Sequence, residues 1–382
     1  MKYKKLKVPF FLPFIDNSDI SEIKKTAKSI FLTNGPKLEK FEKRFQKLTN
    51  SKYAIGVSNA TSALHISLKA LDIGSGDEVI VPDQTFAATA NSVLQSGATP
   101  VIADIDEKTM NISPKSILTN LSKKTKAIIP VHFAGTSCDM KEIMKIAKNN
   151  SLKVIEDCAH AIGTHFNKKH VGTIGDTGCF SFYPTKNLTT IEGGMIITNN
   201  KKIANFAQLV RNHGLNRTLI NRYSSGKPWE YDIEDVGYNY RLDEIRSAIG
   251  ISQLSKIKNL NEKRLNAFQY YNKKLKNIPG LITPIEKNFL NNSCHLYVIR
   301  ITHNAKISRD NLFYHLQKNG IGSTVHYKPL HEFTLFKKKS IHRDQLITSK
   351  KLYDEILSLP LYPQLSKTNQ NYVIYHLKNA LI

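Results

Sequence analysis

The sequence predicts a large three-layer α/β domain with a mainly parallel mixed sheet, followed by a smaller α/β domain. Two observations support this prediction. Short apolar runs alternate with helical patterns through the first two thirds of the chain, and near residue 250 one long helical pattern replaces this alternation. Buried strands that alternate with helices favour a parallel sheet covered on both faces. We therefore predict a large domain over residues 1–250 and a small C-terminal domain over residues 251–382.

Four apolar runs are the predicted strands of the large domain, over residues 77–83, 100–106, 127–133 and 153–157. Helical patterns lie between them, over residues 61–71, 86–97 and 139–150. Ligands of an open α/β sheet bind at the carboxyl ends of its strands, so we expect the informative residues directly after these runs.

The small domain is expected to begin with one long helix over residues 251–278, which has helical periodicity and no intervening strand. A short strand over residues 295–301 and a Pro-rich turn at LSLPLYPQL follow. The long helix is expected to join the two domains.

The chain is strongly basic, with 55 Lys and Arg against 31 Asp and Glu and a formal net charge of +24. Such a charge can attract polyanions. The lysines are spread along the whole chain, however, and no nucleic-acid-binding motif accompanies them, so we predict no nucleic-acid partner. A basic surface would also favour a phosphorylated cofactor and an anionic, nucleotide-linked substrate.

Nothing in the sequence indicates a membrane or a metal. The apolar run near the start is interrupted by Pro9 and Pro13, so we predict no signal peptide, and no apolar stretch reaches the roughly 20 residues of a spanning helix. The 4 cysteines stand apart without zinc-site spacing. We expect a cytoplasmic protein with neither a metal nor a membrane partner.

Two charged residues occupy positions that suit chemistry. Asp157 ends the last of the four predicted strands, where it could also simply cap the next helix. Lys186 follows Pro184 in a turn between a strand through Phe180 and Phe182 and a second strand after Gly193 and Gly194. Most loop lysines are merely solvated, whereas this one is flanked by buried strands and small residues that let a bulky group approach the backbone.

The run SFYPTKNLTTIEGGM around Lys186 resembles the cofactor-lysine motif of the DegT/DnrJ/EryC1/StrS family of sugar aminotransferases. The resemblance extends over nearly the whole chain in the family's order, through LTNGPKLEKFEKRF, SNATSALHISLKAL, GDEVIVPDQTFAATANSV, PVHFAGTSCDM, VIEDCAHAIG, RNHG, GYNYRLDEIRSAIG, VHYKPLH and LPLYPQL. Members are fold-type I enzymes that depend on pyridoxal 5'-phosphate.

The resemblance implies which residues contact each part of the cofactor ring. Lys186 would hold pyridoxal phosphate as a Schiff base, and Asp157 would keep the pyridine nitrogen protonated, so that the ring acts as an electron sink. His160 would lie near the phenolic oxygen, where many relatives have Gln. Phe86 would stack on the ring face, and core packing is its alternative.

The cofactor phosphate would be bound at the start of the first long helix. Ala60, Thr61 and Ser62 would offer backbone amides, and Ser181 a hydroxyl. An ordinary helix cap is the alternative for this stretch. Asn239 matches the residue that in relatives reaches the neighbouring subunit's phosphate, which implies a homodimer with shared active sites. Asp243 and Arg246 depart from the commonest family pattern.

The resemblance also implies a reaction. An amino acid, which the resemblance implies is glutamate, would leave its amino group on the cofactor, and a nucleotide-linked keto sugar would collect it in a ping-pong cycle that serves surface glycan or amino-sugar biosynthesis. Residues that match the sugar side of the pocket, or that are simply structural, are Thr33, Asn34, Gly35, His326 and Tyr327. A sugar-dehydrating relative is one alternative, although such relatives have His at the Lys186 position. A regulator without turnover is the other.

Overall fold

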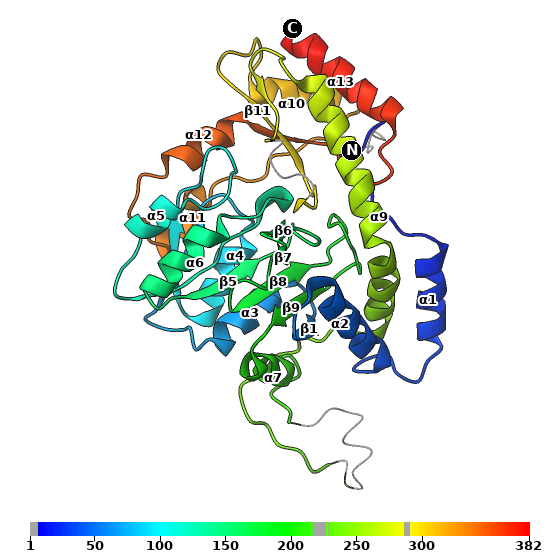
Figure 1. The fold of residues 1–382 in the computed structure, drawn as a ribbon, viewed down its shortest axis with the longest axis vertical. Helices are drawn as coiled ribbons and strands as arrows, with labels where there is room; N and C mark the ends of the chain where they lie inside the picture. Colours follow the sequence, from blue (N-terminus) through cyan, green and yellow to red (C-terminus); the bar gives the residue numbers. More distant parts are fainter. Residues whose placement is uncertain (1–6, 217–226, 228, 286–290) are drawn as a thin grey trace.

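The structure is a computed structural model that describes residues 7–216, 227, 229–285 and 291–382. Residues 1–6, where the stretch considered for a signal peptide begins, lie outside the described part. Figure 1 shows a large lower body around a sheet and a smaller upper body, with the long helix α9 running between them. None of the described helices combines the length and the apolar character needed to cross a membrane.

The large body is organised around a seven-stranded sheet in the order β1-β9-β8-β5-β4-β2-β3. Strands β3, β2, β4, β5 and β8 are parallel, whereas β9 is antiparallel to both of its neighbours. The predicted, mainly parallel mixed sheet is therefore confirmed. The strand bounds are β1 Tyr53–Val57, β2 Glu78–Pro82, β3 Thr99–Ala103, β4 Thr125–Ile128, β5 Lys153–Asp157, β8 Thr177–Ser181 and β9 Gly194–Thr198.

Two of the four predicted strands end several residues early. Strand β3 stops at Ala103 rather than residue 106, and strand β4 stops at Ile128 rather than residue 133. Pro130 has no N–H to continue the ladder, yet its carbonyl oxygen accepts a hydrogen bond from the Asp157 amide at 2.9 Å. The chain after β4 thus stays beside the end of β5 without forming a regular strand.

Helices cover both faces of the sheet because its residues alternate in direction. On β9, Ile196 packs into the core beneath α3, α4 and α7, whereas Met195 and Ile197 pack beneath α2 and α9. Helices α5 and α6 extend the second layer over β2 to β5. The bounds are α2 Pro36–Thr49, α3 Ala60–Ala70, α4 Ala88–Ser96, α5 Pro114–Thr119, α6 Met140–Asn149, α7 Lys201–Val210 and α9 Glu244–Leu275.

Helix α9 begins at Glu244 instead of the predicted residue 251. Asp243 is its N-cap, and the Asp243 carboxylate accepts a hydrogen bond from the Arg246 amide at 2.8 Å. The cap lies within GYNYRLDE, which the apolar periodicity alone did not include in the helix.

The smaller body has its own sheet and its own core. Strands β10, β11 and β12 pair antiparallel, and Tyr271, Tyr297 and Leu377 are buried between this sheet and the helices around it. The N-terminal Val8 also packs here, so the predicted division at residue 250 stays a prediction. The remaining bounds are α1 Asn17–Ala27, β6 His165–Phe166, β7 Lys169–His170, β10 Leu281–Ile282, β11 Tyr297–Ile301, α10 Arg309–Lys318, α11 Thr334–Lys339, α12 Ile347–Glu355, β12 Ile356–Leu359 and α13 Lys367–Leu381.

Part of the C-terminal sequence returns to the large sheet. Leu330, Phe336 and Leu346 are buried in the core that α3 and α4 share with the sheet, and Ile341 forms a parallel bridge to Val101 of β3. This return places residues 326–331 at the carboxyl end of β2.

Candidate active site

The turn between β8 and β9 presents Lys186, as the sequence predicts. The turn is closed by the Lys186 amide, which donates to the carbonyl of Tyr183 at 2.9 Å. The Lys186 side chain is partly buried, and this burial lowers the pKa of its ammonium to about 8, while the charge of Asp157 acts in the opposite direction. A substantial fraction of Lys186 is therefore the neutral amine near pH 8.

Asp157 lies at the end of β5 with only 5% of its surface exposed. Its carboxylate accepts hydrogen bonds from the Thr89 hydroxyl at 2.9 Å and from the Ala159 amide at 3.1 Å. Burial nevertheless raises the pKa of the Asp157 carboxyl, and no residue of the described part forms an ion pair with it. This acid sits where a cationic group would stabilise its charged form.

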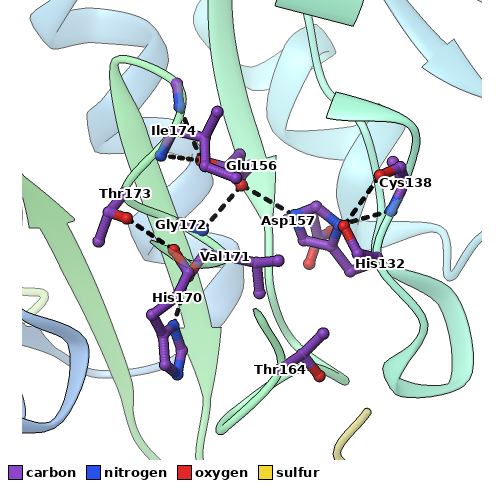
Figure 2. Close-up of polar contacts among 12 residues, drawn as sticks. His132, Cys138, Glu156, Asp157, Thr164, His170, Val171, Gly172, Thr173 and Ile174 are labelled. Atoms are coloured by element: carbon purple, nitrogen blue, oxygen red, sulfur yellow. Dashed lines mark hydrogen bonds and ion pairs between the residues drawn. The ribbon is translucent and has the colours of Figure 1, made fainter. Parts of the chain in front are cut away.

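The neighbouring acid, Glu156, is committed to structure. Its carboxylate accepts amide hydrogen bonds from Gly172 at 2.7 Å, Ile174 at 2.8 Å and Gly175 at 2.7 Å, and a fourth bond from His132 Nε2 at 3.0 Å. Figure 2 shows Glu156 between this turn and the His132 ring. Such a set of donors lowers the pKa of the Glu156 carboxyl against the opposing effect of burial.

The tautomer of His132 follows from its contacts. Its Nδ1 accepts the Cys138 amide at 3.1 Å, so the proton is on Nε2 and is donated to Glu156. The His132 amide also donates to the carbonyl of Asp157 at 3.1 Å, which holds the tip of β5. His132, Glu156 and Cys158 lie close enough to hold a metal, but the His132 and Glu156 ligand atoms already have these partners. We assign the group a structural role.

His160 and Tyr327 form a hydrogen-bonded pair across the two bodies. His160 Nδ1 accepts the Ala134 amide at 3.3 Å, so Nε2 carries the proton and donates to the Tyr327 hydroxyl at 3.1 Å. Burial lowers the pKa of His160 well below its usual value, which keeps the ring neutral. The Tyr327 hydroxyl is left with its own proton to donate.

His326 and Tyr327 line a small pocket of about 40 Å³ together with Lys186 and His295. His326 Nδ1 lies 2.8 Å from the Ser358 hydroxyl, and burial lowers the pKa of the His326 ring to about 3. Both sequence-predicted residues of the VHYKPLH segment therefore lie beside Lys186, and the structure adds His295.

Phe86 stands at the edge of this group. Its side chain is 62% exposed, and its ring centroid lies 6.0 Å from that of Tyr327. Core packing, the alternative for Phe86, is therefore wrong. An exposed aromatic face at the end of β2 is available to a flat ligand.

The start of α3 combines a cap with free donors. The Asn59 side chain accepts the Ser62 amide at 2.8 Å, so Ser62 is the ordinary cap contact that the sequence left open. The amides of Ala60 and Thr61 have no acceptor within the described residues. Ser181, which ends the adjacent β8, accepts only a long bond from the Tyr183 amide at 3.4 Å. Two amides and one hydroxyl thus remain for an anion.

The other predicted residues lie apart from the Lys186 pocket. Asn34 and Gly35 line a different cavity of about 490 Å³, and Thr33 forms a bridge to Asp243. Asn239 is exposed and pairs through its backbone with Asn212, another lining residue of this cavity. Within one chain, the predicted site residues therefore form two groups.

Sequence reasoning missed three residues that contact the site. Thr89 donates to Asp157, the His295 ring lies against the His160 ring in a tilted arrangement with centroids 4.4 Å apart, and Gln84 donates to the His326 carbonyl at 3.0 Å. Gln84 lies in the turn after β2 and Thr89 in the first turn of α4, the next helix, so the rule that ligands gather after strands could have identified them. His295 lies in an apolar strand pattern that gave no signal.

Comparisons with known protein families, curated proteins and solved structures all indicate the same kind of protein, an aminotransferase family that acts on sugars. The model of the DegT/DnrJ/EryC1/StrS aminotransferase family matches residues 13–378. Spore coat polysaccharide biosynthesis protein SpsC of Bacillus subtilis is 39% identical over 96% of this chain and 95% of its own length. Among solved structures, Helicobacter pylori PseC, an aminotransferase of pseudoaminic acid biosynthesis, is 29% identical with a TM-score of 0.90 and covers 99% of both chains.

A further solved structure is similar to the same extent. The putative sugar aminotransferase Spr1654 of Streptococcus pneumoniae, in its PLP-form, is 29% identical with a TM-score of 0.90 and covers 98% of each chain. The fold class expected from the sequence is confirmed, because these neighbours share the large mixed sheet and the smaller α/β body.

Proposed function

Because this chain belongs to the DegT/DnrJ/EryC1/StrS family of sugar aminotransferases, we propose that it carries pyridoxal 5'-phosphate on Lys186 and aminates a nucleotide-linked keto sugar. One observation carries the proposal. Asp157, a buried carboxylate that forms no ion pair with the described residues, ends the strand next to β8, and β8 leads into the turn that presents Lys186 with its lowered pKa.

The residues present fit this cofactor. Asp157 can accept a hydrogen bond from a protonated pyridine nitrogen, which would supply the positive charge that the buried carboxylate lacks. The free amides of Ala60 and Thr61, at the positive end of the α3 dipole, suit the phosphate. Gly194 packs against the backbone of Asn59 so closely that a Cβ there would lie 2.5 Å from it, which keeps β9 against this helix start.

The chemistry follows from the side chains around Lys186. Pyridoxal phosphate, when bound, supplies an electron sink for the carbon that loses its proton. Lys186 takes that proton and returns it, for which an amine with a pKa of about 8 is well matched to neutral conditions. The neutral His160 orients the Tyr327 hydroxyl, whose proton is free to be donated within the pocket.

We further propose the partners that the sequence suggests. The amino donor is glutamate, as the family resemblance implies, and the acceptor is a keto sugar linked to a nucleotide, in a ping-pong cycle. The similarity to SpsC and PseC supports a role in surface glycan or amino-sugar biosynthesis. We place the enzyme in the cytoplasm, as expected from the sequence.

The second group of predicted residues supports a homodimer with shared sites. Thr33, Asn34, Gly35 and Asn239 lie together on one side of the chain, outside the pocket of Lys186. We propose that this group completes the Lys186 site of the partner subunit. Exposed apolar side chains on the same side are consistent with a covered surface, and these are Ile30, Phe31, Leu32, Ile233 and Val236.

Isotope exchange between glutamate and 2-oxoglutarate tests the proposed function without knowledge of the sugar. Purified full-length protein with pyridoxal phosphate should pass label between the two compounds, and Lys186→Ala should reduce the exchange by at least roughly a thousandfold. Exchange by neither protein, after a panel of other amino acids and their keto acids has also failed, would favour the regulator.

A further inference from the structure

The segment that brings His326 and Tyr327 to Lys186 is held by one buried acid. Asp83 directly follows β2, and its surface is 0% exposed. Its carboxylate accepts the His331 amide at 3.0 Å and His331 Nδ1 at 2.6 Å, and its carbonyl accepts the Leu330 amide at 2.9 Å. A hydroxyl bond from Ser349 completes the set. Three of these bonds fix the far end of residues 326–331.

The near end of the segment is held by the same turn of the large body. Gln84 Nε2 donates to the His326 carbonyl at 3.0 Å, and the Phe86 ring lies 6.0 Å from that of Tyr327. Tyr327 therefore lies between two anchors, both of which come from residues 83–86. We therefore expect the 3.1 Å contact between its hydroxyl and His160 Nε2 to depend on both anchors.

We propose that Asp83 and His331 are a positioning pair that sets the Tyr327 hydroxyl against His160 and Lys186. This inference rests on the proposed function, because it assumes that Tyr327 acts at Lys186. The ion pair is charge-assisted and its acid is buried, so the loss of the His331 donor leaves a buried carboxylate short of a partner. Without this bond, residues 326–331 are held less firmly and can shift. A displacement of about 1 Å is enough to slow a reaction strongly.

The charge of the pair gives it a pH dependence. The groups that face His331 are Asp83, Glu332, Lys350 and the ring of His342, at a centroid distance of 6.5 Å. The hydrogen bond to Asp83 raises the pKa of His331 above its usual 6.5. A raised pKa means that the ion pair contributes fully below about pH 6.5 and weakens as the pH rises through the folded-state value. Positioning of Tyr327 should weaken in the same direction.

The test compares the wild type with His331→Leu, His331→Asn and Arg343→Leu, all full-length and loaded with pyridoxal phosphate. The Asn side chain can place an N–H near the position of Nδ1 and does not titrate, whereas Leu donates nothing. Arg343 is the matched control, because its ion pair with Glu78 at 2.8 Å docks the same C-terminal stretch onto the opposite end of β2.

We expect His331→Leu to lower kcat roughly tenfold or more with a smaller change in KM, and His331→Asn to recover to within roughly threefold of the wild type. The kcat of the wild type should fall more steeply with rising pH than that of His331→Asn. Arg343→Leu should lower the melting temperature and leave kcat within about twofold. Equal kcat losses in Arg343→Leu and His331→Leu, or no rescue by Asn, would overturn the positioning role.

A second readout separates this inference from the proposed function. Hydrogen–deuterium exchange of the peptide that contains residues 326–331 should be faster in His331→Leu and unchanged in Arg343→Leu, with or without cofactor. If the wild type takes up no pyridoxal phosphate, the proposed function fails and exchange alone decides whether the pair holds the segment. Unchanged exchange in His331→Leu contradicts the pair in either case.

Discussion

The surroundings of Asp157 are the strongest indication of which ligand the site binds. It is buried at the end of β5, it accepts only two hydrogen bonds from the described chain, and its pKa is raised. A ligand with a cationic nitrogen would stabilise the charged form of this buried carboxylate. A residue that only caps a helix would not need such a ligand. Glu156, one residue earlier, has its full set of donors and shows what a purely structural acid looks like here.

Asp157→Asn tests the assigned role. The variant should still bind pyridoxal phosphate, since Lys186 and the amides of α3 remain, but it should transaminate at least roughly a hundredfold more slowly because a neutral amide no longer keeps the ring nitrogen protonated. Single-turnover kinetics with an amino acid donor measure the loss. Thr89→Val removes the neighbouring hydrogen bond without removing the charge, so it should cost much less. A rate for Asp157→Asn near that of the wild type would remove Asp157 from this role.

The lowered pKa of Lys186 predicts how the rate of cofactor capture depends on pH. With a pKa of about 8, its neutral fraction rises roughly fivefold between about pH 7 and pH 8 and levels off about one unit above. The rate at which cofactor-free protein captures pyridoxal phosphate should follow this curve, because only the neutral amine attacks. Stopped-flow absorbance measures the rate. A rate still rising tenfold per unit beyond about pH 9 would show that the Lys186 pKa is not lowered.

At the scale of elements, the start of α3 and the start of β9 act together. Gly194 has no side chain, and a Cβ there would meet the backbone of Asn59 at 2.5 Å and the amide nitrogen of Ala60 at 2.8 Å. Because these contacts are to backbone, the helix start itself would have to move. The two free amides that we assign to the phosphate would move with it.

Gly194→Ala should therefore weaken pyridoxal phosphate binding by roughly tenfold or more and lower the melting temperature. Gly74→Ala is the matched control, since the added Cβ there meets its nearest atom at an ordinary 3.5 Å. Fluorescence titration of each cofactor-free variant with pyridoxal phosphate gives both affinities. Wild-type affinity in Gly194→Ala, with the protein folded, would contradict the assignment of the phosphate to this helix start.

The elements themselves were largely predictable, for a physical reason. The strands of the large sheet are buried on both faces and are therefore continuous apolar runs, which stand out in a sequence. The predictions that failed concern element bounds, which single residues set, or contacts between segments that lie far apart in the sequence. Strand β1 was not predicted, strand β3 stops at Ala103, strand β4 stops before Pro130, and α9 starts at the Asp243 cap instead of at its apolar residues. The return of Leu330 and Phe336 to the large core joins segments far apart in the chain, and no local pattern encodes it.

For the site, motif resemblance identified the residues but not their contacts. Lys186, His326 and Tyr327 line one pocket, and their roles there stay predictions. The bond between His160 and Tyr327 was not predictable, because one residue was expected at the cofactor and the other at the sugar. Geometry alone reveals that the two expectations concern one hydrogen-bonded pair.

At the scale of the whole molecule, the two separate groups of predicted residues motivate our proposal of a shared site. Asn239 of one subunit is predicted to serve the cofactor on Lys186 of the other. Asn239 is exposed and is not among the residues that line the Lys186 pocket, which supports this placement.

A mixing experiment decides the matter. Asn239→Ala and Lys186→Ala should each be weak or inactive as homodimers. In the mixed dimer both lesions fall at one composite site, and the other site is intact, so each heterodimer should show about half the activity of a wild-type dimer. If subunits demonstrably exchange and activity does not rise above that of the parents, Asn239 acts within its own chain.

The central claim is that Lys186 carries the cofactor, and borohydride reduction tests it most directly. Reduction fixes pyridoxal phosphate on the lysine that holds it, and peptide mapping by mass spectrometry then locates the adduct. We expect a yellow protein that loses its colour on reduction, with the adduct on Lys186 in the peptide that contains SFYPTKNLTT. An adduct on another lysine, or none after the protein has been supplied with cofactor, would contradict the account.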